Sequence, residues 1–382
     1  MRDELEQRRI DTCDVVVVGA GLVGAAVAAR LARAGVDTAI LEAQETAGGA
    51  TRRSAGMTLT GLTGSYKEAT KTYGRQKARK IWSLTIEGRE RLIEAAEQQK
   101  IPIGNTGSLT LATGEAEAKA LKESATLLRE DGFDVQFYPS DPLARGFTVA
   151  LRHPADATVN AAALTQSLLD NNDVTVHERT EVHDLESEGG KVRVWAQRRT
   201  VLCNAVVLAV NGYAPLLDSW FVDKITPTRT LTFSTEPMNE IVLEQPCCVN
   251  TSGGDYKYCR QLPDRRLLLS DRHRPSHNLS RQSNGERDMA GLNDAAKDRL
   301  TRFTRHYFPE VKIDNVDLES GVLGLTPDGL PLIGRLPDRR QVHFAIGLGG
   351  QGLAWAIVIA ERVVKFLLHD IDPGILSAAR LD

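Results

Sequence analysis

The fold is decided near the N-terminus by residues 14–24, Asp14-Val-Val-Val-Val-Gly19-Ala20-Gly21-Leu22-Val23-Gly24, together with Glu42. Four consecutive valines predict a short strand that is buried on both faces. After the glycines, apolar residues recur at helical spacing until Gly35, and a second apolar stretch at 36–41 leads to Glu42. The stretch therefore predicts a strand, a glycine-rich turn, a helix and a second strand.

The three glycines and the acid each have a physical role in holding a dinucleotide. Gly19 permits the tight turn, Gly21 lets the backbone approach a pyrophosphate, and Gly24 lets the helix pack closely on the strand. The pyrophosphate would lie on the helix N-terminus, where free N–H groups and the helix dipole favour negative charge. Glu42 would bind the adenosine ribose. The alternative is an α/β unit whose glycines serve only packing, and the motif alone does not distinguish NAD from FAD.

Composition narrows the class of protein. The chain has 382 residues, a formal net charge of −3, 42% hydrophobic residues and 25% charged residues, which indicates a globular protein that does not bind nucleic acid. No apolar run is long enough to span a bilayer, and residues 1–12 are too polar for a secretory signal, so we expect a cytoplasmic protein. Five cysteines without a C-x-x-C motif predict no disulfide framework. We expect no metal site, because Pro275 interrupts the spacing between His273 and His277.

Two further segments each allow two interpretations. Residues 48–57 are rich in small side chains and include Arg52 and Arg53, which fits either a loop against a flat ligand or a solvated surface loop. Residues 228–235, 255–261 and 266–270 predict antiparallel strands of a second domain. The alternating side chains of one of these strands share a face, which is either a pocket wall or a solvated sheet surface. These side chains are Tyr256, Tyr258 and Arg260.

The remaining landmarks are a helical segment and a second glycine-rich turn. Residues 67–91 show helical spacing of apolar residues with many basic ones between, which predicts a helix with a solvated face. Residues 342–346 predict a buried strand, followed by glycines at 347–352 and a long apolar helix from Leu353. A second anionic group could rest on the N-terminus of that helix.

Together these residues resemble the FAD-dependent oxidoreductases of the D-amino-acid oxidase superfamily, which includes the glycine and sarcosine oxidases. The resemblance covers nearly the whole chain and rests on three anchors: residues 19–24 with Glu42, Thr-Pro-Asp-Gly-Leu-Pro-Leu-Ile-Gly at 326–334, and Gly-Gly-Gln-Gly at 349–352. Residues 211–215 and 258–260 look most similar to the branch of the gamma-glutamylputrescine oxidoreductases. The resemblance implies that the dinucleotide is FAD.

The resemblance also implies a fold and a division of the chain. The fold class would be mixed α/β, with a Rossmann-like FAD-binding domain around a central parallel sheet and a substrate domain built on an antiparallel sheet. The FAD-binding domain would comprise residues 1–85, 150–216 and 320–382. The substrate-binding domain would comprise residues 86–149 and 217–319.

Site residues follow from the same resemblance. The helix N-terminus at 349–353 would stabilise the negative charge that reduction places on the N1–C2=O edge of the flavin. The substrate-side and catalytic residues would be Arg52, Tyr256, Tyr258, Arg260, His273 and Gln351. The cofactor-binding residues would be Gly19, Ala20, Gly21, Leu22, Val23, Gly24, Glu42, Ala43, Arg52, Arg53, Ser54, Ala55, Gly56, Met57, Val182, Asn211, Gly212, Gly349, Gly350, Gln351, Gly352 and Leu353.

Departures from the family pattern are informative. Residues 322–325 are Val-Leu-Gly-Leu where relatives of the sarcosine oxidase type attach flavin through a cysteine, so we expect non-covalent FAD. The carboxylate-binding arginine of glycine oxidase would fall near Leu323, and the corresponding lysine of sarcosine oxidase near Ala354. The lysine that helps oxygen react with reduced flavin would fall near Leu268. All three basic residues are absent, which weakens a simple amino-acid oxidase and leaves the use of oxygen open.

The hypothesis that follows is oxidation of a C–N bond in a small-molecule amine or amino acid. Hydride would pass to flavin N5, and the resulting imine would hydrolyse. One alternative to an oxidase that releases hydrogen peroxide is a dehydrogenase that passes electrons to a quinone or protein acceptor. Another is a non-catalytic flavin-binding subunit of a larger complex. Homo-oligomerisation and a partner subunit both stay open.

Overall fold

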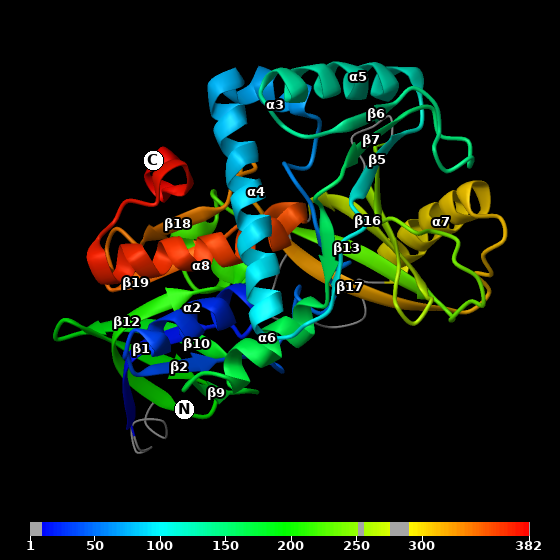
Figure 1. Cartoon of the computed structure of the whole chain (residues 1–382). Helices are drawn as coiled ribbons and strands as arrows, with labels where there is room; N and C mark the ends of the chain where they lie inside the picture. The colour runs from blue at the N-terminus through cyan, green and yellow to red at the C-terminus, as the bar shows by residue number, and fades with distance from the viewer. Residues whose placement is uncertain (1–9, 251–255, 276–289, 382) are drawn as a thin grey trace.

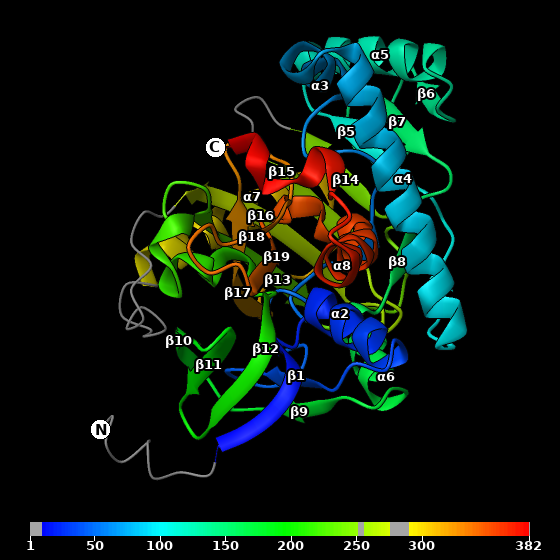
Figure 2. The same ribbon diagram turned by 90° about the vertical axis from the view of Figure 1, so that its left-hand side faces the viewer.

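The computed structural model describes residues 10–250, 256–275 and 290–381, and in this part of the chain two large sheets and one small sheet carry the fold (Figure 1). Helices fill the space around the sheets (Figure 2). Among the helices that the structure describes, none combines the length and the apolar character needed to cross a membrane. The predicted mixed α/β fold is confirmed.

The first sheet contains the parallel strands that the N-terminal motif predicts. β1 (Ile10–Val18) pairs in parallel with β2 (Thr38–Leu41) on one side and with β12 (Thr200–Leu208) on the other. β12 also pairs in parallel with β19 (Val342–Ile346), so the tail of the chain completes the sheet that its start begins. The other members are β9 (Thr175–His177), β10 (Val182–Glu188), β11 (Lys191–Ala196) and β18 (Leu332–Arg335).

Helices cover one face of this sheet in two tiers. α2 (Leu22–Arg33) and α8 (Gly352–His369) contact each other, and Figure 2 shows both lying between the central strands and α4 (Arg75–Gln98). The contact between α4 and α8 is close because Gly88 has no side chain: a Cβ there would lie 1.8 Å from the Ala354 carbonyl oxygen. α6 (Ala161–Asp170) packs beside α2.

One long helix was predicted for residues 67–91, and the structure divides it. α3 (Tyr66–Tyr73) ends and α4 begins at Gly74, whose φ of 79° lies in the left-handed region that glycine adopts readily. α3 begins with a capping box between Ser65 and Glu68. The break lets α3 run beside α5 (Glu115–Glu130), away from the first sheet (Figure 1).

The second sheet is antiparallel except where β14 pairs in parallel with β5. The three strands predicted for it are present, although residue 255 lies outside the described part. β17 was not predicted, because its exposed acidic residues and two glycines interrupt the apolar alternation. In order the strands are β17 (Val316–Leu325), β13 (Thr226–Thr235), β16 (Leu267–Pro275), β15 (Tyr256–Gln261), β14 (Cys247–Asn250), β5 (Ser108–Ala112), β7 (Ala150–His153) and β6 (Gln136–Tyr138).

One face of the second sheet packs against α7 (Ala290–Tyr307), and the other contacts residues 55–59 through Cys248 and Tyr258. A small sheet of β3 (Met57–Thr58), β8 (Ala157–Val159) and β4 (Ile103–Gly104) lies where the two large sheets meet. β7 and β17 belong to the second sheet although they begin in or extend into ranges predicted for the FAD-binding domain. The division of the chain into two domains stays a prediction.

Candidate active site

A cavity of about 940 Å³ lies where the first sheet, the two glycine-rich turns and the second sheet meet. Its volume is at the upper end of the roughly 300–1,000 Å³ that ligand pockets usually have. The start of α2 lines one part and the start of α8 another, while β13, β15, β16 and β17 contribute from the second sheet. The cavity can therefore hold a long ligand that touches two helix N-termini.

The α2 end of the cavity has the geometry of a dinucleotide cradle. Gly19 has a φ of 103°, and a Cβ on Gly24 would lie 1.9 Å from the Gly19 carbonyl oxygen, so the turn and the helix contact require both glycines. A Cβ on Gly21 would lie 3.2 Å from Thr51 Oγ1. Leu22 N–H donates to that hydroxyl over 3.0 Å, which anchors residues 49–57 beside the start of α2.

Glu42 lies at the carboxyl end of β2, where its charge faces the cavity. Its Oε2 accepts a hydrogen bond of 2.7 Å from Ala20 N–H, and its Oε1 accepts one of 2.8 Å from Gln44 N–H. Each carboxylate oxygen keeps a lone pair for a further donor. This is the arrangement that a ribose diol requires, and a phosphate would meet repulsion there.

The α8 end is held by a side chain from η1 (Asn211–Leu216). Asn211 Oδ1 accepts hydrogen bonds of 3.1 Å from both Gly347 N–H and Leu348 N–H, which fixes the turn before η4 (Gly349–Gln351). α8 has no side-chain N-cap, so its first N–H groups stay available at the cavity. The Gln351 Oε1 atom is buried without a hydrogen-bond partner among the described residues. A ligand edge that donates a hydrogen bond would satisfy it.

Most of the predicted cofactor residues line this cavity, although their individual roles stay predictions. Three predicted residues lie behind the lining. Ala20 is buried and donates its N–H to Glu42, and Gly24 lies under the turn. Gly212 packs against the Leu323 carbonyl. Arg53 lines the cavity, whereas Arg52 is exposed and lies outside the lining. The predicted residues that line it are Gly19, Gly21, Leu22, Val23, Glu42, Ala43, Arg53, Ser54, Ala55, Gly56, Met57, Val182, Asn211, Gly349, Gly350, Gln351, Gly352 and Leu353.

The three alternating residues of β15 share a face, as predicted, but they lie in different surroundings. Tyr258 lines the large cavity, and Tyr256 lines a smaller one next to it. Arg260 lines neither cavity. Its Nη1 donates a hydrogen bond of 2.9 Å to the Ala55 carbonyl, which anchors residues 49–57 to β15. Burial lowers the pKa of Arg260. His273 lies on β16, and its side chain is outside the described residues.

Sequence reasoning missed several lining residues. Thr51 contacts the start of α2 only in the folded chain, and no local pattern marks it. Arg229, Thr230 and Ser270 reach the cavity from β13 and β16, where the strand pattern was recognised but the face toward the ligand was not. Ser270 lies directly opposite Tyr258 on the neighbouring strand, so its side chain shares the face of Tyr258. Aligning the two predicted strands could have identified Ser270.

FAD fits the residues around the cavity. An extended dinucleotide requires two helix N-termini, a carboxylate placed to bind a ribose, and glycines that keep both turns open. The residues around the cavity supply all of these. Among the described lining residues there is neither a cysteine nor a histidine to attach a flavin covalently. A sheet with parallel central strands, a mostly antiparallel sheet and one cavity between two such turns define the class of a dinucleotide-binding protein.

Comparison with known proteins identifies which dinucleotide. The sequence model of the FAD dependent oxidoreductase family, DAO, matches residues 14–366. The chain therefore belongs to the DAO family of FAD-dependent oxidoreductases, so the predicted family and the FAD cofactor are confirmed.

The relatives cover most of the chain. The probable oxidoreductase OrdL of Haemophilus influenzae is 26% identical over 95% of this chain and 84% of that protein. The gamma-glutamylputrescine oxidoreductase of Escherichia coli is 24% identical over 94% of this chain and 85% of that protein. The structure of glycine oxidase from Geobacillus kaustophilus superposes with a TM-score of 0.76 at 23% identity, covering 96% of this chain and 98% of that one. This likeness confirms the fold.

Proposed function

We propose that this enzyme oxidises a C–N bond of a small amine or amino acid. The observation that supports this most is the single cavity that joins both helix N-termini to polar side chains of the second sheet. Relatives named glycine oxidase and gamma-glutamylputrescine oxidoreductase bear the names of compounds with amine groups. A fold neighbour named for glycerophosphate shows that the fold alone does not select an amine, so the cavity supports FAD-dependent oxidation and the choice of an amine rests on the sequence relatives.

The residues around the cavity divide the work of holding the cofactor. Glu42 and the start of α2 would hold the adenosine and pyrophosphate half, and the N–H groups at the start of α8 would face the flavin half. When bound, FAD supplies a two-electron acceptor that takes hydride from the carbon next to nitrogen. Asn211 keeps the turn before α8 in place by accepting from two N–H groups. Met57 and Leu323 contribute apolar side chains to the cavity lining.

The charges around the cavity favour a neutral amine. The carboxylates in its described lining are Glu42 and Glu181, which lie at the ends of β2 and β10, away from α8. No carboxylate in the described lining of the large cavity therefore lies beside Tyr258 to stabilise an ammonium group. Because a free lone pair on nitrogen is what assists hydride loss from the neighbouring carbon, we expect the rate of flavin reduction to rise with pH toward the pKa of the amine.

The electron acceptor is proposed from the absence of a lysine in the described lining. Among the described lining residues none is a lysine, and position 268 is a leucine. A lysine ammonium near reduced flavin favours transfer to oxygen, and the two cations of this lining, Arg53 and Arg229, are guanidinium groups. The absence of a lysine there favours a dehydrogenase that uses a quinone or protein acceptor. Peroxide release that accounts for every flavin reduced would instead assign an oxidase.

The experiment that tests the function follows the flavin itself. The purified protein is loaded with FAD and mixed anaerobically with a panel of amines and amino acids, and the loss of the visible absorption of oxidised flavin (bleaching) is recorded. We expect at least one amine to bleach the flavin, and acid precipitation to release all FAD into the supernatant. Stable FAD binding with no bleaching by any amine would favour the non-catalytic subunit, and flavin that precipitates with the protein would contradict non-covalent binding.

A further inference from the structure

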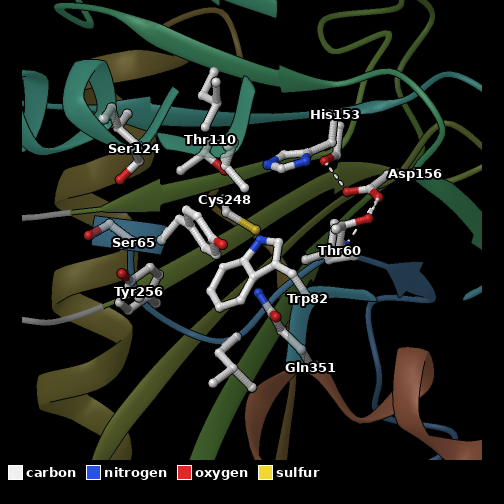
Figure 3. A pocket seen from close by; sticks show the side chains of 18 residues that line it. Thr60, Ser65, Trp82, Thr110, Ser124, His153, Asp156, Cys248, Tyr256 and Gln351 are labelled. Carbon is white, nitrogen blue, oxygen red and sulfur yellow. Dashed lines mark hydrogen bonds between the residues drawn. The ribbon is translucent and has the colours of Figure 1, made fainter. Parts of the chain in front are cut away.

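A second, smaller cavity opens beside the first turn of α8, and Figure 3 shows the side chains around it. It shares Leu59 and Gln351 with the large cavity, so the two are neighbours across those side chains. Its volume is about 40 Å³, room for about three water molecules at roughly 10–15 Å³ each. A group of about three non-hydrogen atoms at the end of a ligand would fill it.

The charges at this cavity are balanced. Asp156 is 1% exposed, and its Oδ1 accepts from Thr60 N–H at 3.1 Å and from the Thr60 hydroxyl at 2.6 Å. Its Oδ2 accepts 2.7 Å from the Ser108 hydroxyl, and Arg89 lies 3.3 Å away as counter-ion. The carboxylate is therefore fully engaged. No lysine or arginine is among the described residues that line this cavity.

Uncharged hydrogen-bonding groups face the remaining space. His153 on β7 points its ring into the cavity in Figure 3, and none of the hydrogen bonds found among the described residues involves that ring. Burial lowers the pKa of His153, which keeps the imidazole neutral. At the other end the buried Gln351 Oε1 has no partner among the described residues. Leu121, Leu151 and Trp82 supply apolar walls between these ends.

We propose that this cavity receives the tail of the substrate and selects a tail that is short, uncharged and hydrogen-bonding, of the carboxamide or hydroxyl class. This inference rests on the proposed function. A charged tail would be buried without a counter-ion, which costs several kcal/mol. A purely apolar tail would leave His153 and Gln351 unsatisfied. A carboxamide has three non-hydrogen atoms, a donor and an acceptor, and so matches both the volume and the chemistry.

The test compares amines that differ only in the tail. Matched series of ω-amino amides, ω-amino acids, diamines and branched alkylamines, with two to five carbons between the ends, are mixed anaerobically with the FAD-loaded enzyme. We expect the best amide to exceed its carboxylate and ammonium counterparts by about 100-fold in the second-order rate of flavin reduction, and its branched alkyl counterpart by about 10-fold. Equal or faster reduction by charged or alkyl tails would overturn the inference and leave C–N oxidation intact.

Binding provides a second readout that does not need turnover. Simple amides and the matching carboxylates, which carry no amine, are titrated into the FAD-loaded enzyme, and the flavin difference spectrum gives their Kd. Tighter binding of the amides by about 10-fold or more supports the cavity even if no amine reduces the flavin, an outcome that would reject only the proposed function. Equal binding of both classes, as a cavity that holds only water would give, would overturn the inference.

Variants test whether His153 causes the preference for an uncharged polar tail. His153→Leu removes the polar end of the cavity, and we expect the preference for an amide over an alkyl tail to fall to within about 3-fold, with FAD affinity unchanged. His306→Leu, at an exposed site on α7, is the matched control and should leave the preference intact. If His153→Leu does not fold, Thr110→Val removes a hydroxyl from the same wall with little change of shape. An unchanged tail preference in a folded His153→Leu protein would contradict the assignment.

Discussion

Gly88 offers the sharpest test of how the helix layers position the site. Gly88→Ala adds one methyl group where α4 crosses α8, and the new Cβ would lie 1.8 Å from the Ala354 carbonyl oxygen. Ordinary van der Waals contact requires at least 3.4 Å, so the two helices must move apart by more than an ångström. The obstacle is backbone, and no side-chain rotation relieves it.

Two effects of opposite sign decide the outcome. Helix propensity alone would make Gly88→Ala stabilising by about 1 kcal/mol. Overpacking costs about 1–3 kcal/mol, and a clash with backbone belongs at the upper end. We therefore expect the free energy of unfolding to fall by about 2 kcal/mol. Because Ala354 follows the start of α8 by two residues, we also expect weaker FAD binding and a shifted flavin spectrum.

The assay is urea unfolding of the FAD-free protein, with FAD affinity measured separately by fluorescence titration. Ser83→Ala on the exposed side of α4 is the control, because it changes propensity without adding a contact, and it should stay within about 0.5 kcal/mol of the parent. A Gly88→Ala protein that is as stable as the parent, or more stable, would refute the packing argument.

Three further predictions address the site and the cores. Glu42→Gln loses a charge-assisted acceptor and should weaken FAD binding about 10- to 100-fold by titration, whereas exposed Glu45→Gln should not. Asp156→Asn leaves buried Arg89 with only the exposed carboxylate of Glu90, 3.7 Å away, and should lower the free energy of unfolding by about 3 kcal/mol, measured in urea. Burial lowers the pKa of His343 to about 4. Since the unfolded chain then binds a proton that the native state excludes, stability should fall by at most about 3 kcal/mol between pH 6.5 and 4, and His343→Phe should flatten this pH dependence.

The parts of the fold that sequence predicted correctly are those with local causes. The strand, turn and helix around Gly19–Gly24 depend on residues a few positions apart, and the same holds for the turn and helix around Gly349–Gly352. The sequence did not predict β17, because its strand conformation depends on pairing with β13 and not on alternation within its own residues. The sequence predicted one continuous helix across Gly74, because a single glycine does not always end a helix.

The details of the site depended on contacts that no local pattern reports. The shared face of Tyr256, Tyr258 and Arg260 follows from alternation, but the cavity that each faces follows from where other chain segments cross the sheet. Arg52 and Arg53 are adjacent, and only the path of the backbone decides which one reaches the ligand. Asn211 is a similar case, since its partners Gly347 and Leu348 lie far along the chain.

The order of strands in the first sheet has a consequence for how the protein is made. β1 emerges from the ribosome before the other strands of this sheet, yet its neighbour β12 follows only at residues 200–208, and β19 completes the sheet at residues 342–346. Pairings this distant in sequence form slowly, and the nascent chain must carry an unpaired strand edge until β19 has been synthesised. FAD can therefore be captured only after translation has passed the last strand and α8, so a chain truncated before β19 should accumulate as an aggregation-prone, colourless product.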